Sequence, residues 1–522
     1  MNTFMNGLKD TFNYTLTENG GVTHKTTKSD LLDMFAMGAA MRNRSDEDVI
    51  VMFRKAFNEN PTYALKCLFY IRDIRGGQGE RRFFRVAMKD LAVYNTEAAS
   101  RNLELVPEFG RWDDLYIFVG TPLEAQAFAL IKKQLVLDVQ CKTPSLLAKW
   151  LKSENTSSAA SRSLASKTRA YLHMSHKEYR KTLSILRGRI NVLEKLMSAG
   201  KWDEIEFDKI PSRAGMIYKN AFARHDIERM KSEKIVISYE AFAKDTTTKV
   251  NAKALYPYEC VAEALKIANH NRYGWGYSSS NRGNMDIDRA MVNKYWDNLA
   301  DYFNGAAFNG LAVVDTSGSM TGHSPDAPIN VAISLGLYCA EKAKGPFAGH
   351  YISFASRPQL IATEGIDFVD KVERIYKTDL VDNTNIVATF DLLLDTALKN
   401  NCKQEDLPQN IIIISDMEFD SATSSWGYRS CGSSWTAINH NNAETVMEGV
   451  AKKWAAHGYK MPKIVYWNVD ARQANIPQDM GNGYVSYVSG MSPSIFQTIM
   501  TGKTGYDLMM EKLDSERYAA IG

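Results

Sequence analysis

Four short apolar runs in the C-terminal part of the chain constrain its fold most strongly. They read GLAVVDTS, FAGHYISFAS, NIIIISDM and KIVYWNVD. Nearly continuous β-branched or apolar runs of this length are expected of strands that are buried on both faces. Amphipathic helical stretches lie between them, at 327–344, 386–399 and 441–457. This alternation predicts a parallel, doubly wound α/β domain over residues 305–522.

The chain before this domain has a helical pattern instead. Apolar residues recur at helical spacing through residues 28–230, with few glycines or prolines inside the segments. Helix pairs without strand signals predict a HEAT-like array over 28–304 that could close into a ring, after an N-terminal segment at 1–27. The fold class is therefore α plus α/β. Within the array, IVISYEAF fits either a strand or a helix start, and HNRYGWGYSSSNRGN reads as a loop before a last helix, DIDRAMVNKYWDNLADYF.

The composition is that of a soluble globular protein, and we expect this protein in the cytoplasm. Hydrophobic residues make up 45% of the chain and charged residues 24%. No stretch approaches about 18 consecutive apolar residues, and the N-terminus lacks the layout of a secretion signal. The six cysteines include no C-x-x-C pair. We therefore expect neither a membrane segment, nor a disulfide framework, nor a zinc site.

Charge is distributed unevenly along the chain. Residues 305–522 carry 17 Lys and Arg against 24 Asp and Glu, whereas the first 304 residues carry 46 against 36. The basic N-terminal part suggests a polyanionic partner.

A set of oxygen-bearing side chains is expected at the carboxyl edge of the predicted sheet. Asp315, Ser317 and Ser319 follow the first strand, Asp416 follows NIIIIS, and Thr384 lies in the loop that enters the helix at 386–399. Carboxylates and small hydroxyls suit a hard cation such as Mg²⁺, or Mn²⁺ or Ca²⁺ in its place. The alternative is that these residues only cap the helices that follow.

These residues resemble the metal-ion-dependent adhesion site of von Willebrand factor A domains. The resemblance implies that the five residues hold Mg²⁺ directly or through water, and that an acidic group of a ligand completes the coordination sphere. In that family the second aspartate is commonly followed by glycine. Here Met417 follows it, and the added acids Glu418 and Asp420 could repel an acidic ligand or bind a second ion.

Two basic stretches are candidates for contacts with RNA. Residues 141–190 hold eleven Lys and Arg against two acids, with aromatic residues among them, and IRDIRGGQGERRFFR forms a second cluster. Cations can neutralise phosphates while aromatic rings stack on bases. A solvated helix face, or arginines paired with Asp73 and Glu80, would explain the same pattern. The candidate residues are Arg72, Arg75, Arg81, Arg82, Lys149, Lys167, Arg169, His173, His176, Lys177, Arg180, Lys181, Arg187 and Arg189.

The helical part also resembles known families. GRWDDL, within a helical array joined to an A-type domain, is similar to the TROVE module of the Ro autoantigen family. Four stretches of the helical part and one of the α/β part are similar to a large family described only as a domain of unknown function. They are IRDIRGGQGERRFF, LLAKWLKSENTSS, YRKTLSILRGRINVLEKLMSAGKW and PSRAGMIYKNAFARHD, and, in the α/β part, SDMEFD. The Ro resemblance implies a helical ring closed by the A domain, which binds structured or misfolded small RNAs.

Three hypotheses for function remain at this point. The leading one is an RNA-binding, Ro-like scaffold, a ribonucleoprotein component whose Mg²⁺ site recruits a partner through an acidic group. The second is a protein-binding assembly or adhesion-type scaffold without nucleic acid. The third is a metal-dependent nuclease built on Asp416, Glu418 and Asp420. A ring closed within one chain would make a monomer sufficient.

Overall fold

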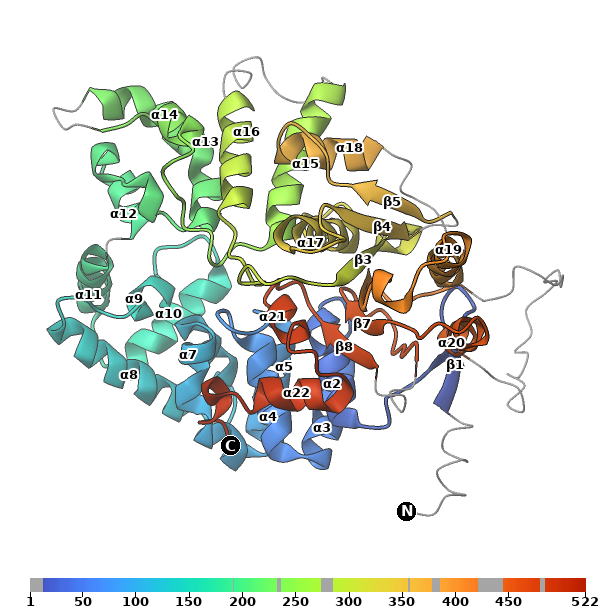
Figure 1. The fold of residues 1–522 in the computed structure, drawn as a ribbon. Helices are drawn as coiled ribbons and strands as arrows, with labels where there is room; N and C mark the ends of the chain where they lie inside the picture. Colours follow the sequence, from blue (N-terminus) through green and yellow to red (C-terminus); the bar gives the residue numbers. More distant parts are fainter. Residues whose placement is uncertain are drawn as a thin grey trace. The chain divides into compact units, whose positions relative to one another are not determined.

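The computed structural model describes residues 13–190, 192–231, 236–273, 285–354, 357–377, 385–420, 445–478 and 484–522. Two compact units make up the chain (Figure 1). We name them the sheet unit, formed from residues 1–67, 255–281 and 299–517, and the helical unit, formed from residues 68–254, 282–298 and 518–522.

The sheet unit is built on a six-stranded sheet in the order β5-β4-β3-β6-β7-β8. Neighbouring strands run parallel, except that β5 pairs antiparallel with β4 at the edge. Every residue of the central strand β3 is buried. The strands are β3 (Gly310–Asp315), β4 (His350–Phe354), β5 (Gln359–Ala362), β6 (Asn410–Ser415), β7 (Lys463–Asn468) and β8 (Val485–Ser489).

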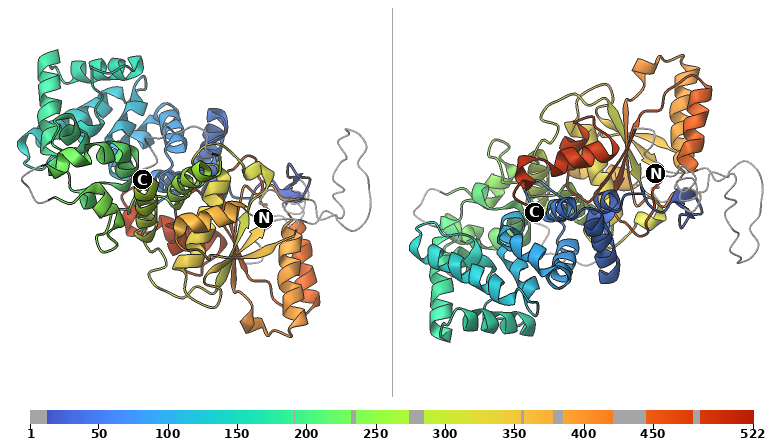
Figure 2. Two further views of the ribbon diagram at one scale, coloured as in Figure 1. Left: turned by 90° about the horizontal axis from the view of Figure 1, so that it is seen from above. Right: turned by 90° about the horizontal axis from the view of Figure 1, so that it is seen from below.

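Helices cover the sheet on both faces, as Figure 2 shows. α17 lies against β3 and β4, and α2 lies against β8. Gly336 lets α17 approach closely, because a Cβ at this position would lie 2.4 Å from Cγ2 of Val314. The described helices of the sheet unit are α2 (Asp30–Met37), α3 (Asp46–Glu59), α15 (Pro257–Tyr273), α17 (Pro328–Lys342), α18 (Phe368–Lys377), α19 (Ile386–Lys399), α20 (Val446–Ala456), α21 (Ile495–Ile499) and α22 (Gly505–Leu513).

A small hairpin near the N-terminus belongs to the same unit. Strands β1 (Tyr14–Leu16) and β2 (Val22–His24) pair antiparallel. His24 bridges to Ile476 after β7, and Gly20 bridges to Asp420 after β6. The hairpin therefore lies at the carboxyl edge of the sheet.

The helical unit contains helices and short 3-10 turns among its described residues. α4 (Pro61–Arg72) leads into it from the sheet unit. Capping boxes fix some helix starts, as at α11, where Ser175 and Glu178 bond each other's backbone. The helices are α5 (Arg82–Tyr94), α6 (Thr96–Arg101), α7 (Val106–Phe109), α8 (Glu124–Gln140), α9 (Leu147–Trp150), α10 (Ala159–Tyr171), α11 (His176–Arg189), α12 (Leu193–Ser198), α13 (Ser212–Met230), α14 (Tyr239–Lys244) and α16 (Met285–Asp297).

The fold class of α plus α/β is confirmed, and the four apolar runs form β3, β4, β6 and β7. The sheet is mixed rather than wholly parallel because of β5. IVISYEAF leads into α14, and most of the expected loop at 270–284 lies outside the described residues. The sheet unit also takes in α2, α3 and α15, so the compact units differ from the expected boundary at residue 305.

Candidate functional site

Asp315 and Asp416 are brought together by the pairing of β3 with β6. These strands are parallel neighbours, so their carboxyl ends meet at one edge of the sheet. Asp315 ends β3, and Asp416 follows directly on β6. Ser415 donates a hydrogen bond of 2.5 Å from Oγ to Oδ2 of Asp315. Both carboxylates are buried, with 0% and 1% exposure.

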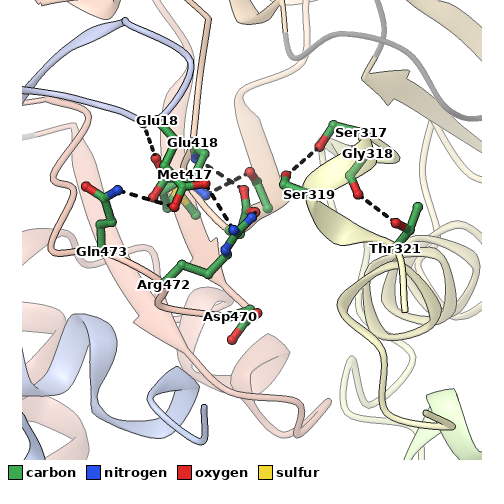
Figure 3. A network of polar contacts seen from close by, with 12 residues as sticks. Glu18, Ser317, Gly318, Ser319, Thr321, Met417, Glu418, Asp470, Arg472 and Gln473 are labelled. Carbon is green, nitrogen blue, oxygen red and sulfur yellow. Dashed lines mark hydrogen bonds and ion pairs between the residues drawn. The ribbon is translucent and has the colours of Figure 1, made fainter. Parts of the chain in front are cut away.

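The loop after β3 adds two hydroxyl groups. Its backbone turns back at once, since the Ser317 amide donates to Oδ1 of Asp315 at 2.9 Å. The Oγ atoms of Ser317 and Ser319 lie 3.0 Å apart (Figure 3). A short 3-10 turn, Gly318–Met320, completes the loop. The expected grouping of Asp315, Ser317, Ser319 and Asp416 thus appears in the structure.

The electrostatics of this site are unfavourable without a cation. Burial and, after it, the nearby charge of Asp315 together raise the pKa of Asp416 to about 7, against the hydrogen bond of Ser319. Burial likewise raises the pKa of Asp315, against the hydrogen bonds of Ser415 and Ser317. Two like-charged carboxyls in one buried site favour protonation of at least one of them. A bound cation would relieve the same repulsion.

One atom is left without a partner in this arrangement. Within the part of the chain that the structure describes, Oδ2 of Asp416 is buried and accepts no hydrogen bond, and Nη1 of Arg472 lies 4.0 Å from it. A buried acceptor without a donor is costly unless something else binds it. The donor set of two carboxylates and two hydroxyls fits Mg²⁺. In the described part of the chain, no three His, Cys, Asp or Glu side chains form a metal cluster, so this site depends on its hydroxyls.

The alternative that these residues only cap helices receives little support. The Ser317 side chain makes no capping hydrogen bond to the 3-10 turn that follows it, and no side chain caps α17. α19 is capped by Asn385, which accepts from the Ala388 amide at 2.9 Å. Thr384, the fifth predicted metal ligand, lies outside the described residues.

The segment after Asp416 has an unusual backbone. Met417 has a φ of +69°, in the left-handed region that glycine adopts most easily. The conformation is therefore the one that glycine would favour, although the residue is a buried methionine. The non-glycine residue does not prevent the turn, because contacts on either side hold it.

Glu418 is fully buried, and both of its carboxylate oxygens accept hydrogen bonds. Its Oε2 accepts from the Glu18 amide at 2.7 Å, and its Oε1 accepts from Nδ2 of Asn475 at 2.7 Å. Burial raises its pKa, against these bonds. Because both oxygens already have donors, Glu418 is a poor candidate for the second ion of a nuclease.

The tip of the β1-β2 hairpin holds this segment in place. Oγ1 of Thr17 donates to the Phe419 carbonyl at 2.6 Å, and Nδ2 of Asn19 donates to the Glu418 carbonyl at 2.5 Å. Sequence reasoning missed these residues, since they lie some 400 positions from their partners, in the turn between two strands of only three residues each. The hairpin is thus part of the candidate site.

Several candidate RNA-binding residues in the helical unit are used in structural contacts. The guanidinium of Arg72 is buried 2.7 Å from a carboxylate oxygen of Asp114. Arg187 donates to the carbonyls of Ala148 and Leu151 and to Oγ of Ser153. These bonds occupy both side chains.

Three further candidates are engaged in the same way. Lys167 pairs with Glu124 at 2.8 Å. Arg169 pairs with Glu154 at 2.9 Å. Arg189 donates to the Val139 carbonyl at 2.7 Å.

Other candidates remain at the surface. Arg75 and Arg81 are exposed and Arg82 is half-buried, and Arg75 donates to the Glu108 carbonyl at 3.0 Å. His176 contacts Glu154 at 2.9 Å. Exposed cationic or histidine side chains gather on α11 and near it, at Lys149, His173, His176, Lys177, Arg180 and Lys181. In the described part of the chain, Lys177 and Lys181 pair with no acid.

The fold and the site define a chain with a helical unit and an α/β unit that carries an acid and hydroxyl site at its carboxyl edge. The chain belongs to the family described as Domain of unknown function (DUF2828), whose model matches residues 17–145 and 138–305. The model of Domain of unknown function (DUF7788) matches residues 309–519. These matches agree with the similarity expected from the sequence stretches of the helical part.

Comparison with known proteins gives two further similarities. Uncharacterized protein L728 of Acanthamoeba polyphaga mimivirus is 30% identical over 529 residues, which cover 94% of this chain and 85% of that protein. Among solved structures, the RO (RSR) protein of Deinococcus radiodurans is 14% identical, covering 90% of this chain and 93% of that chain, with a TM-score of 0.37. A similarity of this degree decides neither the fold nor the function. No helix within the described ranges is long and apolar enough to cross a bilayer.

Proposed function

We propose that the chain is an RNA-binding scaffold of the cytoplasm whose sheet unit binds an acidic group of a partner through Mg²⁺. Asp315, Ser317, Ser319 and Asp416 would hold the ion, and Thr384 is the fifth proposed ligand. When bound, the ion supplies a positive charge to which a carboxylate can attach. The sequence resemblance to von Willebrand factor A domains points to the same chemistry.

One observation carries the metal half of the proposal. Two carboxyls lie buried together, and none of the described residues donates a hydrogen bond to Oδ2 of Asp416. If these two acids had only a structural role, we would expect a cationic side chain to be bonded to them. Arg472, at 4.0 Å, is too distant for a hydrogen bond.

Calorimetric titration with Mg²⁺ tests this half, using Asp416→Asn in place of the native residue. We expect the variant to lose Mg²⁺ binding and keep its fold. Asp470→Asn is the matched control, because Asp470 is also a buried acid with a raised pKa at the carboxyl end of a strand, but bonds Asn43. Equal Mg²⁺ affinity in native chain and Asp416→Asn would overturn the metal assignment.

The RNA half is supported by the exposed face of α11. Lys177, Arg180 and Lys181 lie within two turns of one helix, and all three are exposed. A pocket of about 480 Å³ opens beside this helix, lined in part by Arg180, Arg187 and Lys195. Phosphate contacts of this kind depend on charge and weaken with salt.

A charge-reversal experiment tests the RNA half. The triple variant Lys177→Glu, Arg180→Glu and Lys181→Glu should bind structured RNA at least about tenfold more weakly, and the salt dependence of binding should become shallower. Changing the exposed Lys399, Lys403 and Lys460 of the sheet unit to Glu alters the net charge equally and is the control. If both triple variants bound RNA equally weakly, RNA binding could not be assigned to this face of α11.

A second candidate function, a protein-binding assembly scaffold, is favoured by a separate observation. Val136 and Val139 at the end of α8 are 52% and 48% exposed, and Leu146 in the following loop is 53% exposed. Exposed apolar side chains in one region are typical of protein contacts. Purified chain that carries no RNA and gives no gel shift with structured RNA would favour this candidate.

A further inference from the structure

A carboxylate already lies bound at the rim of the candidate metal site. Nη2 of Arg472 lies 3.1 Å from Oε2 of Glu18, and Nε2 of Gln473 donates to Oε1 of the same carboxylate at 3.3 Å (Figure 3). Arg472 and Gln473 are consecutive in the loop that follows β7. Two donors on one loop thus engage the two oxygens of one carboxylate, an arrangement that recognises carboxylates specifically.

This carboxylate-binding pair borders the buried acids. Nη1 of Arg472 lies 4.0 Å from Oδ2 of Asp416, the oxygen that accepts no hydrogen bond from any described residue. The loop is fixed near this position, because the Arg472 amide bonds the Asp470 carbonyl at 2.9 Å. A ligand carboxylate attached at the cation site would therefore arrive next to the guanidinium of Arg472.

The backbone at Glu18 is held at the site independently of the Glu18 side chain. Its amide donates to Oε2 of Glu418, and Thr17 and Asn19 bond the carbonyls of Phe419 and Glu418. The side chains of Glu18 and Arg472 are each 37% exposed. Ion pairs with this exposure contribute little net free energy, so the Glu18 carboxylate can rotate away while the hairpin stays in place.

We propose that Arg472 and Gln473 form a carboxylate subsite beside the metal site, that Glu18 occupies it as an internal ligand, and that an acidic side chain of a protein partner displaces Glu18. This inference rests on the proposed metal-dependent function. It specifies the partner group as a carboxylate that contacts both the cation and Arg472. It also gives the N-terminal hairpin the role of an internal competitor.

The test uses the full chain in the presence of saturating Mg²⁺. The probe is the peptide acetyl-Gly-Glu-Gly-amide, and the control probe is acetyl-Gly-Gln-Gly-amide. Binding is followed by NMR titration in the native chain and in Glu18→Gln, Arg472→Gln and the double variant. Removing the internal competitor in Glu18→Gln should tighten binding of the Glu peptide about two- to fivefold. Arg472→Gln should weaken it, and the gain from Glu18→Gln should vanish in the double variant.

The outcomes separate this inference from the proposed function. If Mg²⁺ binds the native chain but Glu18→Gln and Arg472→Gln leave peptide affinity unchanged, the carboxylate subsite is wrong and the metal site stands. If no variant binds the Glu peptide more tightly than the Gln peptide, the subsite is also wrong. If calorimetry detects no Mg²⁺ binding to the native chain, the proposed function fails and this inference fails with it.

Discussion

The two units of this protein treat buried charge in opposite ways. In the helical unit, the carboxylate of Asp114 lies 2.7 Å from Arg72 on one oxygen and 2.7 Å from Arg85 on the other. In the sheet unit, Asp315 and Asp416 are buried together, and Oδ2 of Asp416 has no hydrogen-bond donor among the residues that the structure describes. Opposite charges that bond each other hold a fold together, whereas like charges buried together indicate a site for a ligand.

The pKa values of Asp114 and Asp416 shift in opposite directions, in line with this difference. Burial alone would raise the pKa of Asp114, but the charges of Arg72 and Arg85 lower it. The pKa of Asp416 is raised to about 7 by burial and by the charge of Asp315. The cationic neighbours of Asp114 already balance its charge, whereas Asp416 has a raised pKa and a second buried carboxyl beside it.

The largest expected effect is on the helical unit. Arg72→Ala leaves the Asp114 carboxylate with a buried charge that has lost a partner, and should lower the free energy of unfolding by about 3–5 kcal/mol. Chemical denaturation followed by circular dichroism measures this. Arg101→Ala is the control, because its pair with Glu97 is exposed, and should cost under about 1 kcal/mol. Similar small losses in both variants would mean that the buried pair does not stabilise the unit.

The next effect concerns Mg²⁺ and the sheet unit. Free Mg²⁺ at 100 times its Kd should stabilise the native chain by about 2.7 kcal/mol, because only the folded site binds the ion. Asp315→Asn should remove this stabilisation without lowering the stability of the metal-free chain, since it also removes one of two repelling charges. Thermal unfolding with and without Mg²⁺ provides the measurement. A metal-free variant that unfolds well below the native chain would show that Asp315 is structural.

The pH dependence of Mg²⁺ binding gives a third test. Because the pKa of Asp416 is about 7, a proton must leave before the ion binds at lower pH. Mg²⁺ affinity should fall by up to about tenfold for each pH unit below 7 and level off above it. Calorimetry in two buffers of different ionisation enthalpy would report the released proton. Affinity that stays constant between pH 5 and 7 would contradict the raised pKa.

In the metal-free chain the same shift changes stability with pH. The folded pKa of Asp416 is raised above its ordinary value of 3.8, so the contribution to stability is present at low pH and is lost as the pH rises toward about 7. Denaturation midpoints of the metal-free native chain and Asp416→Asn should differ least below pH 4. If the Asp416 carboxyl instead made the native chain more stable as the pH rose from 4 to 7, the raised pKa of Asp416 would be contradicted.

The smallest effect separates surface cations from structural ones. Lys177→Ala and Lys181→Ala should change stability by less than about 0.5 kcal/mol, because neither side chain pairs with an acidic partner among the described residues. Arg187→Ala should cost more, about 1–3 kcal/mol, because it leaves buried carbonyls without donors. Equal stability of all three variants would remove the distinction drawn between these residues.

Much of the sheet and the core of the site could be predicted from the sequence. Parallel pairing makes the carboxyl ends of β3 and β6 meet, so Asp315 and Asp416 had to lie close once those strands were predicted. β8 gave no such signal, because two of its five residues, Ser486 and Ser489, interrupt the apolar run. They are nevertheless buried, and Oγ of Ser489 bonds the Phe35 carbonyl of α2.

Long-range contacts account for what the sequence could not predict. The hairpin strands are three residues long, and the turn between them contacts residues near Glu418 that lie some 400 positions away in the sequence. Charge counts likewise do not tell which cations are free. Arg187 and Lys177 lie on the same helix, yet only the first donates to backbone carbonyls. Such differences depend on neighbours that composition does not specify.

The most direct test of the central claim is an anomalous difference map from crystals of the chain grown with Mn²⁺, which replaces Mg²⁺ at oxygen-rich sites. The account predicts one strong peak within coordination distance of Asp315 and of Oδ2 of Asp416, with Ser317 and Ser319 beside it. A map without a peak at these residues, at Mn²⁺ concentrations that saturate binding in solution, would contradict the account.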